Sequence, residues 1–332
     1  MLQKRGKRLG SFCRVFFMAA VVFLVTQPLY GWTPDRMEIV MPHRVESNHN
    51  LITREFCQVW QNHIGNENFK FVNKGGAGGR VGFDQYIQHS DKDGSALLSG
   101  NIVTGAVMYA QQEPPWDWME NLVPVGIYAM EPGVLMVQTD SEYETLQDVI
   151  EASKKSPVLV GTSRWVQGET LQLHQIMEQT GAQFEIIPFG SGGATRAALL
   201  GGHVDMISRK ASGIKKGGGK FRALSISMEK NIVPDLIGED VPTTDEAAGF
   251  NTINVGSYRT MLVHKSVKEN FPERYNNLKE TLEKAKDDPD YIKVAEKQGY
   301  PSQTIIDMTP EELNSMIEKQ FDTFERFKEH YK

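Results

Sequence analysis

FKFVNKGGAGGRVG, residues 69–82, joins a short apolar strand to a glycine-rich loop and then to the start of a helix. The strand is predicted at Phe69–Val72, and helical spacing continues through Phe83, Tyr86 and Ile87. Glycines in such a loop let backbone N–H groups approach a ligand without Cβ atoms in the way. The free N–H groups and partial positive charge of a helix N-terminus favour an anion. The stretch therefore predicts an α/β unit with an anion site at its loop.

The same order of strand, loop and helix recurs along the chain. A second glycine-rich loop, Pro188–Thr195, follows a strand predicted at 184–187, and a third, Gly161–Gly168, follows one predicted at 158–160. This alternation is typical of βαβ units with a largely parallel sheet. Right-handed crossovers place the loops after the strands at one edge, where ligands bind in open α/β sheets. Further strands are predicted at Met37–Val40, Ala96–Leu98, Val204–Ile207 and Ala223–Ile226.

The glycine loops do not match the usual nucleotide or hydrolase motifs. A dinucleotide run starting at Gly76 and Gly78 needs a third glycine where Val81 stands, and the Gly-Lys-Ser/Thr ending of a P-loop is missing. Ser191 lacks the glycine two residues earlier that a nucleophile elbow requires. We therefore interpret the three loops as converging donors for an anion or a small polar molecule.

Composition narrows the remaining functions. The 332 residues carry 36 Lys and Arg against 42 Asp and Glu, a formal net charge of −6. An acidic balance argues against a nucleic-acid partner, because phosphate contacts need clustered cations. The cysteines, Cys13 and Cys57, rule out a disulfide scaffold, and no Cys and His cluster has zinc spacing. Cys57 is predicted to be a buried, inert thiol. The sequence thus predicts no metal and no cofactor.

The first 31 residues are predicted to be a secretory signal peptide. Residues 1–14 hold five positive charges and no acid, and Val15–Thr26 is an uncharged run of 12 residues. About 20 residues would be needed to span a bilayer. Leu29 and Gly31 match an A-x-A cleavage site poorly, so an uncleaved anchor is the alternative. Cleavage would leave a mature chain of charge −11, from −6 minus five positive charges.

Two helical regions are predicted toward the C-terminus. Thr309-Pro310-Glu311-Glu312 is a capping box with proline at the first helical position, and an apolar stripe follows it. Pro272–Gln298 is charged and helical, with a break at Asp288-Pro289.

Four segments of the chain, in order, resemble one known family. They are Tyr30–Arg54; Gly75–Gly82 with Asp91-Lys92-Asp93-Gly94; Pro188–Asp205, which ends Leu200-Gly201-Gly202-His203-Val204-Asp205; and Asp240-Val241-Pro242-Thr243 with Glu246-Ala247-Ala248-Gly249. The first segment is similar to the start of the mature family protein, where a strand leads to a binding loop. The second is similar to the family's GAGG loop and P-D-G turn, the third to its L-L-G-G-x-V-D segment and the fourth to its D-V-P-T…E-A-G signature. The family is the substrate-binding proteins of tripartite tricarboxylate transporters, also called the Bug family.

This resemblance implies a type II periplasmic-binding fold, with two α/β lobes and a ligand cleft between them. Lobe one is expected at residues 32–133 plus 257–332 and lobe two at 134–256. A periplasmic, non-catalytic, monomeric receptor of Venus-flytrap type is implied, which closes on a carboxylate or aromatic acid and delivers it to membrane permease subunits. Backbone N–H groups, hydroxyls and waters hold the ligand in this family.

The chain departs from the family pattern in its first and third loops. Residues 44–50 lack the usual glycines, and Arg164 and Val166 stand where the third loop normally has glycine. Arg164 either pairs with a ligand carboxylate or points to water, and Trp165 either stacks on a ligand or packs under its loop. The expected ligand contacts are Asn48, His49, Gly76, Ala77, Gly78, Asn101, Thr162, Arg164, Gln167, Ser191, Gly192 and Asp205, the last of which could equally cap a helix.

Two other functions stay open at this point. One is a sensor subunit that reports its ligand to a membrane receptor without transport. The other is a secreted enzyme acting on a small acid, which the missing nucleophile and metal motifs disfavour.

Overall fold

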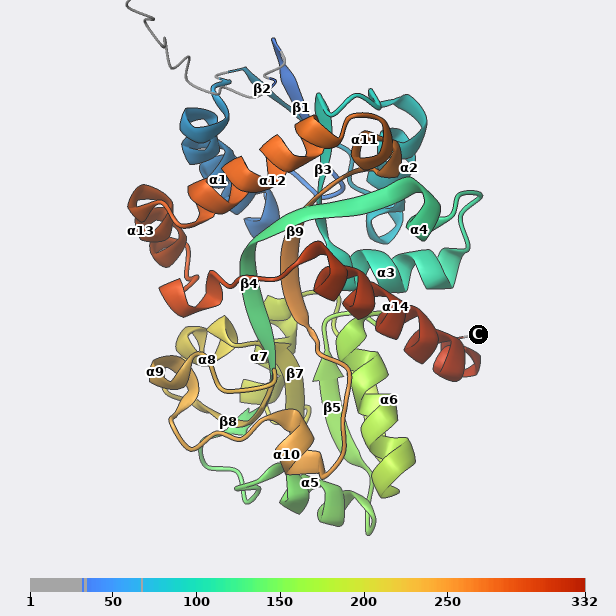
Figure 1. Ribbon diagram of the computed structural model, residues 1–332. Helices are drawn as coiled ribbons and strands as arrows, with labels where there is room; N and C mark the ends of the chain where they lie inside the picture. Colours follow the sequence, from blue (N-terminus) through green and yellow to red (C-terminus); the bar gives the residue numbers. More distant parts are fainter. Residues whose placement is uncertain (1–31, 33–34, 67, 332) are drawn as a thin grey trace, which may run out of the picture. The chain divides into compact units, whose positions relative to one another are not determined.

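The computed structural model describes residues 32, 35–66 and 68–331, so the predicted signal peptide, residues 1–31, lies outside the described residues. The described part is an α/β structure built on one mixed sheet, in which the strand order is β2-β1-β3-β9-β4-β7-β5-β6 and β8 pairs with β4 (Figure 1). The strands are β1 (Met37–Met41), β2 (Phe69–Asn73), β3 (Ala96–Asn101), β4 (Leu122–Gln138), β5 (Val158–Thr162), β6 (Phe184–Pro188), β7 (Met206–Lys210), β8 (Phe221–Ser227) and β9 (Gly256–His264).

The predicted α/β class and seven of these strands are confirmed, but the expectation of a largely parallel sheet is wrong. β1 pairs in parallel with β2 and β3, and β5 pairs in parallel with β6 and β7. β4 and β9, which were not predicted as strands, run antiparallel to each other and to their other partners. Both are buried along almost their whole length, so they lack the alternating pattern that marks a half-buried strand.

Helices cover both faces of the sheet. Both predicted C-terminal helical regions are confirmed. The predicted break within the first of them separates α12 from α13 at Asp287–Asp288. Thr309 caps α14 through a capping box with Glu312, whose carboxylate accepts the Thr309 N–H at 2.7 Å. The helices are α1 (Asn48–Ile64), α2 (Arg80–His89), α3 (Ile102–Gln112), α4 (Trp118–Asn121), α5 (Leu146–Ser153), α6 (Gly168–Thr180), α7 (Gly192–Leu200), α8 (Ser212–Lys216), α9 (Pro234–Ile237), α10 (Thr244–Ala248), α11 (Lys265–Asn270), α12 (Pro272–Lys286), α13 (Pro289–Lys297) and α14 (Pro310–Phe327), with 3-10 turns at Ala77–Gly79, Ser302–Thr304 and Lys328–Tyr331.

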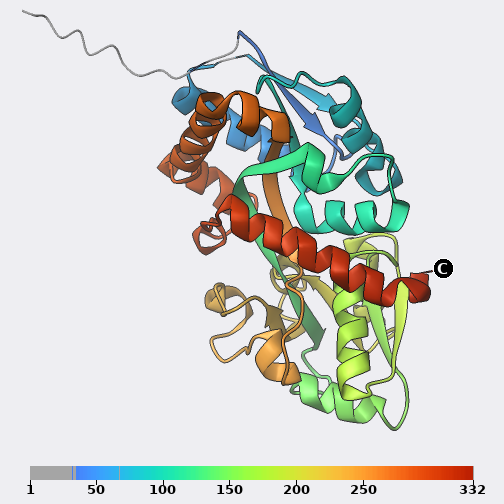
Figure 2. The same cartoon turned by 45° about the vertical axis from the view of Figure 1, so that its right-hand side comes forward.

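Separate apolar clusters stabilise the two halves of the sheet. Around β1 and β9 the core is rich in aromatics, and Phe56 stacks on Tyr128 with ring centroids 4.8 Å apart. Around β5 and β7 the core is mainly aliphatic. Cys57 is buried in the first of these cores, and burial raises the pKa of its thiol, which confirms the predicted buried thiol. α14 lies across α3 and α6, so the end of the chain packs on both halves (Figure 2).

β4 links the two halves by changing partners along its length. Its first part, through Pro132, pairs with β9, and its second part, from Gly133, pairs with β7 and β8. At the change the backbones are in close contact: a Cβ on Gly133 would lie 2.7 Å from the Val255 carbonyl oxygen, and a Cβ on Gly256 would lie 2.7 Å from that of Glu131. Only glycine fits at either position without displacing backbone. The predicted lobe boundaries, at residues 134 and 256, stay a prediction.

We predict that Gly133→Ala lowers the free energy of unfolding by about 2 kcal/mol or more, because its methyl group would push two buried strands apart. Gly100→Ala is the matched strand control. Its Cβ would meet the nearest side-chain atoms at an ordinary 3.6 Å. That change should leave stability unchanged or slightly higher. Urea unfolding compares the two variants, and equal losses in both would contradict the proposed backbone constraint.

Candidate ligand-binding cleft

Two adjoining cavities lie where the loops at the ends of the strands meet. One, of about 450 Å³, is lined mainly by the loops after β1 and β2. The other, of about 590 Å³, is lined mainly by the β1–α1 loop, the loops after β5 and β6, and the end of β7. Both are bordered by His43, Ser47, Thr104, Arg164 and Gly190. We call the two cavities together the cleft.

The loop between β1 and α1 forms one wall of the cleft. Ser47 is the N-cap of α1, and its Oγ accepts a backbone N–H of the first turn at 3.2 Å. The rings of His43 and His49 lie against each other, with centroids 3.9 Å apart. These contacts fix the loop, so that Arg44 and Asn48 border the cleft while remaining exposed.

The glycine loop after β2 forms the adjacent wall. Gly76 and Gly78 have φ angles of 142° and 70°, and Ala77 between them also has a positive φ, 45°. The loop lies close to the β1–α1 loop, because a Cβ on Gly75 would be 3.1 Å from the carbonyl carbon of His43. This geometry agrees with the prediction that backbone of the glycine loop, without intervening Cβ atoms, borders the cleft.

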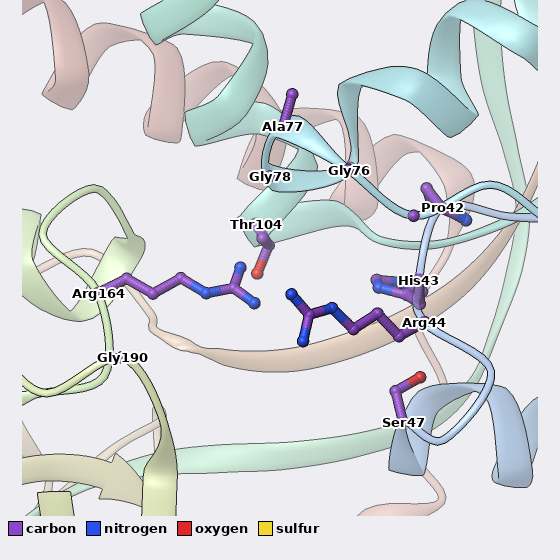
Figure 3. Close-up of a pocket in the computed structure, with 12 residues that line it drawn as sticks. Pro42, His43, Arg44, Ser47, Gly76, Ala77, Gly78, Thr104, Arg164 and Gly190 are labelled. Carbon is purple, nitrogen blue, oxygen red and sulfur yellow. The ribbon is translucent and has the colours of Figure 1, made fainter. Parts of the chain in front are cut away.

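Asn101 and Thr104 contribute from the end of β3 and the start of α3. Asn101 is 9% exposed; its amide Nδ2 donates to Ser257 Oγ at 3.1 Å and its Oδ1 accepts the Tyr258 N–H at 3.3 Å. These bonds tie β3 to β9 beneath the cleft. The hydroxyl of Thr104 points into the cavity toward the guanidinium of Arg164 (Figure 3).

The loop after β5 holds Arg164 from the opposite side. The fully buried Thr162 donates its hydroxyl to the carbonyl of Arg164 at 3.0 Å. Ser163 Oγ donates to Gln167 Oε1 at 3.0 Å. The other polar atom of that amide, the buried Nε2, has no partner among the described residues. The backbone of this loop is thus fixed, while the long Arg164 side chain extends from it.

Trp165 does not border either cavity. It is 37% exposed and meets the rings of Tyr331 and His174 edge to face, at centroid distances of 5.9 and 6.3 Å. The structure therefore supports packing, rather than ligand stacking, for this residue.

The loop after β6 and the end of β7 complete the cleft. Ser191 is the N-cap of α7, and its Oγ accepts the Ala194 N–H at 3.2 Å. The guanidinium of Arg209 lies so close to Gly192 that a Cβ there would overlap it. Lys210 is paired with the buried Glu169.

Positive charge dominates this cleft. Figure 3 shows the guanidinium groups of Arg44 and Arg164 pointing toward each other across the first cavity. Within the described part of the chain, no carboxylate lies within ion-pairing distance of Arg44, Arg164 or Arg209. The one acidic side chain in the lining, Glu169, is already paired with Lys210.

The two histidines of the cleft stay neutral near neutral pH. Burial, followed by the nearby cations Arg259 and Arg164, lowers the pKa of His43 to about 3. Burial and the adjacent His43 ring hold the pKa of His49 well below its ordinary value. His49 Nε2 lies 3.1 Å from Ser99 Oγ, whereas the buried His43 Nε2 has no partner among the described residues.

The cleft brings together most of the residues expected from the sequence, and their role in binding stays a prediction. Thr162 lies behind the lining, where it supports the Arg164 loop. Asp205 is elsewhere: its carboxylate accepts the Leu159 N–H at 2.8 Å, near the start of β5 and at the end away from the cleft. The lining includes Asn48, His49, Gly76, Ala77, Gly78, Asn101, Arg164, Gln167, Ser191 and Gly192.

Several lining residues were not expected from the sequence. Arg44 lies in the segment 44–50, whose change from the family pattern was noted, although only Asn48 and His49 were selected from it, and His43 directly precedes that segment. Arg209 and Lys210 stand at the end of β7, where the rule that ligands bind beyond the carboxyl ends of strands predicts them. The predicted strand at 204–207 ended too early to place them there.

No group of His, Cys, Asp or Glu among the described residues is arranged to hold a metal ion. Among their helices, none combines the length and the apolar character needed to cross a membrane.

Comparisons with known proteins agree with this architecture. Residues 66–329 match the model of a family described as the tripartite tricarboxylate transporter family receptor. Protein BugT of Bordetella pertussis is 26% identical over 225 residues, which cover 66% of this chain and 67% of BugT.

Solved structures show the same fold. A TctC solute-binding protein from Polaromonas superposes with a TM-score of 0.76 at 21% identity, covering 88% of this chain and 98% of that one. The periplasmic binding protein BugD gives 0.64 at 20% identity, with coverage of 89% and 98%. An R. palustris protein with adipate gives 0.65 at 18% identity, with coverage of 89% and 96%. The predicted periplasmic-binding-protein fold is therefore confirmed, and the chain belongs to the tripartite tricarboxylate transporter receptor family of solute-binding proteins.

Proposed function

We propose that this protein captures a small carboxylate-type anion in the cleft, in the periplasm, and delivers it to the membrane permease subunits of a tripartite transporter. One observation carries the proposal: Arg44 and Arg164 direct their guanidinium groups at each other across a cavity, with no carboxylate of the described residues between them. Two like charges held face to face repel, and an anion placed between them removes that repulsion.

The energetics favour a charged ligand over a neutral one. A hydrogen bond to a charged group contributes about 1.5–3 kcal/mol, against about 0.5–1.5 kcal/mol for a neutral pair. A guanidinium also presents parallel N–H donors that match the two oxygens of a carboxylate. Glu169 does not cancel this preference, because Lys210 already neutralises it.

Polar groups around the arginines supply further donors. The hydroxyl of Ser191 and the backbone at Gly76 and Gly192 border the cleft, and the hydroxyl of Thr104 points toward Arg164. Gly192 opens α7, whose first-turn N–H groups lack partners within the helix. Such groups suit carboxylate oxygens that the arginines leave unfilled.

We also propose that binding closes two lobes, residues 32–133 plus 257–332 and residues 134–256, about the crossing of β4 and β9. Support comes from the change of β4 partners at Gly133 and from the origin of the two arginines. Arg44 follows β1, in the first lobe, and Arg164 follows β5, in the second. A ligand that contacts both only in the closed form shifts the equilibrium toward closure by its differential affinity.

The comparisons support the ligand class and the setting. The family model names a receptor of tripartite tricarboxylate transporters, and one structurally similar protein was solved with adipate, a dicarboxylate. We propose that residues 1–31 act as a signal peptide that directs the protein to the periplasm, and that the protein functions there as a monomer. Transport rather than sensing is preferred because the family model describes a transporter receptor.

We predict that Arg164→Ala weakens binding of a small carboxylate by about 1.5 kcal/mol or more, roughly tenfold or greater, because it removes a charge-assisted hydrogen bond. Arg164→Lys should lose less, since it keeps the charge but not the paired donors. Calorimetric titration of purified protein with pentanoate, glutarate and adipate measures this.

Arg36→Ala is the matched control for that titration. Arg36 is exposed directly before β1, at the end of the strand away from the cleft. Its loss should leave affinity unchanged. Unaltered affinity in Arg164→Ala would remove that residue from the site, and failure of every acid to bind the wild-type protein would contradict the proposed function.

His43 makes the free energy of unfolding depend on pH. An unfolded chain protonates His43 below its ordinary pKa of about 6.5, whereas the folded, ligand-free protein resists protonation down to about pH 3. Stability should therefore fall as pH decreases from about 6.5 toward 3, and His43 should account for about 2 kcal/mol of that loss at about pH 5.

Chemical denaturation of the ligand-free protein across this pH range measures the slope. His43→Gln should flatten it, whereas a change at the exposed His203, outside the cleft, should not. An identical slope in the wild-type protein and His43→Gln would show that His43 is not the group responsible.

A further inference from the structure

We infer that Arg209 forms a second anion-binding subsite in the cleft, and that it selects ligands with two negatively charged ends over ligands with one. The inference rests on the proposed function, because it assumes that a small acid occupies the cleft beside Arg164. The two arginines of the first subsite, Arg44 and Arg164, do not by themselves require a second charge on the ligand.

The position of Arg209 separates it from the first subsite. Arg44 borders only the first cavity and Arg209 borders only the second, while Arg164 borders both. A ligand bound between Arg44 and Arg164 therefore has a continuous path, past Arg164, to Arg209. Its far end would lie next to the guanidinium of Arg209.

Arg209 is held in place but lacks a counter-ion. Its guanidinium occupies the space that a side chain at position 192 would fill. Its Nε is buried without a hydrogen-bond partner, and no carboxylate of the described residues is within ion-pairing distance. Burying an unsatisfied charged donor is costly, and an anion bound beside it would remove that cost.

The nearest acid does not fill this role. Glu169 lies in the same cavity, but its carboxylate is bonded to Lys210. Burial lowers the pKa of the Arg209 guanidinium. The nearby Glu169 and Glu131 oppose this shift, whereas the cations Arg196 and Arg164 add to it. The second cavity therefore holds a guanidinium that no carboxylate of the described residues pairs directly.

The lining of the second cavity indicates the chemistry of the ligand's far end. Apart from backbone at the glycines, every side chain that borders it is polar or charged. Two further donors border the same cavity. The buried Nε2 of Gln167 has no partner among the described residues, and the Ser191 hydroxyl, whose oxygen accepts the Ala194 N–H, can donate its own proton. An aliphatic or aromatic tail would find no apolar partner here, whereas a second carboxylate would find several donors.

Calorimetry with matched acids tests the inference. The probes are three pairs with the same carbon skeleton: pentanoate and glutarate, hexanoate and adipate, and octanoate and suberate. We expect the wild-type protein to bind the diacid of at least one pair about tenfold or more tightly than the monoacid. Arg209→Gln should reduce this ratio to near unity.

A pair of glycine variants tests the same point without removing the arginine. Gly192→Ala should displace the guanidinium and lower the ratio, because its methyl group takes the same space. Gly193→Ala is the matched control in the same helix turn, where a Cβ would meet only Ser191 Oγ, at 3.9 Å. It should keep the ratio, and thermal unfolding of each variant verifies that it is folded.

The outcomes separate the two proposals. If acids bind but the diacid has no advantage in any pair, or if the advantage survives both Arg209→Gln and Gly192→Ala, the second subsite is wrong and the anion receptor stands. If no acid of the three pairs binds the wild-type protein, the proposed function itself fails. Loss of binding to both members of a pair in Arg164→Ala supports the proposed function alone.

Discussion

The backbone contact between β4 and β9 is the constraint on which the rest of the molecule depends. Gly133 and Gly256 let the two backbones approach so closely that a Cβ on Gly133 would meet the carbonyl oxygen of Val255, directly before β9, and a Cβ on Gly256 would meet that of Glu131 in β4. On one side of this contact β4 extends the sheet that contains β1, β2 and β3, and on the other it pairs with β7 and β8. The loops that end these strands meet in the cleft, so the crossing determines which side chains face each other.

The charges that line the cleft then determine which class of ligand it can bind. The chain is acidic overall, with a formal net charge of −6, yet the described side chains bring Arg44, Arg164 and Arg209 to one cavity system without ion-pair partners. The exposed side chains of Arg44 and Arg164 are solvated, so they cost little while the protein is empty. Each becomes a strong donor when a ligand and closure exclude water, because the same charge interacts more strongly at low dielectric. Open exposure of Arg44 and Arg164 and a role in binding are therefore compatible.

Much of the fold could be predicted from local patterns. Short apolar runs followed by glycine and a helix located seven strands and the loops after them. β4 and β9 could not be found in this way, because buried residues on both faces remove the alternation on which strand prediction depends. The antiparallel character of the middle of the sheet was missed with them.

Local sequence patterns also predict only some of the residues that line the cleft. The positions of Gly76 and Gly192 follow from strand and loop order, and both residues line the cleft, while their contact with a ligand stays a prediction. Arg209 depends on where β7 ends and on the bare Gly192 beside it, which is a contact between distant segments. Asp205, which was expected to contact the ligand, lies directly before β7 instead, and its carboxylate accepts the Leu159 N–H at the end of the sheet away from the cleft.

The central claim is that the cleft recognises negative charge. The most direct measurement compares thermal unfolding of the dialysed protein with adipate and with its uncharged diamide, which has the same skeleton. A ligand at about 100 times its dissociation constant adds about 2.7 kcal/mol to the free energy of unfolding. The account predicts a rise in Tm with the acid and none with the diamide. An equal rise with both compounds, or a rise with the diamide alone, would contradict it.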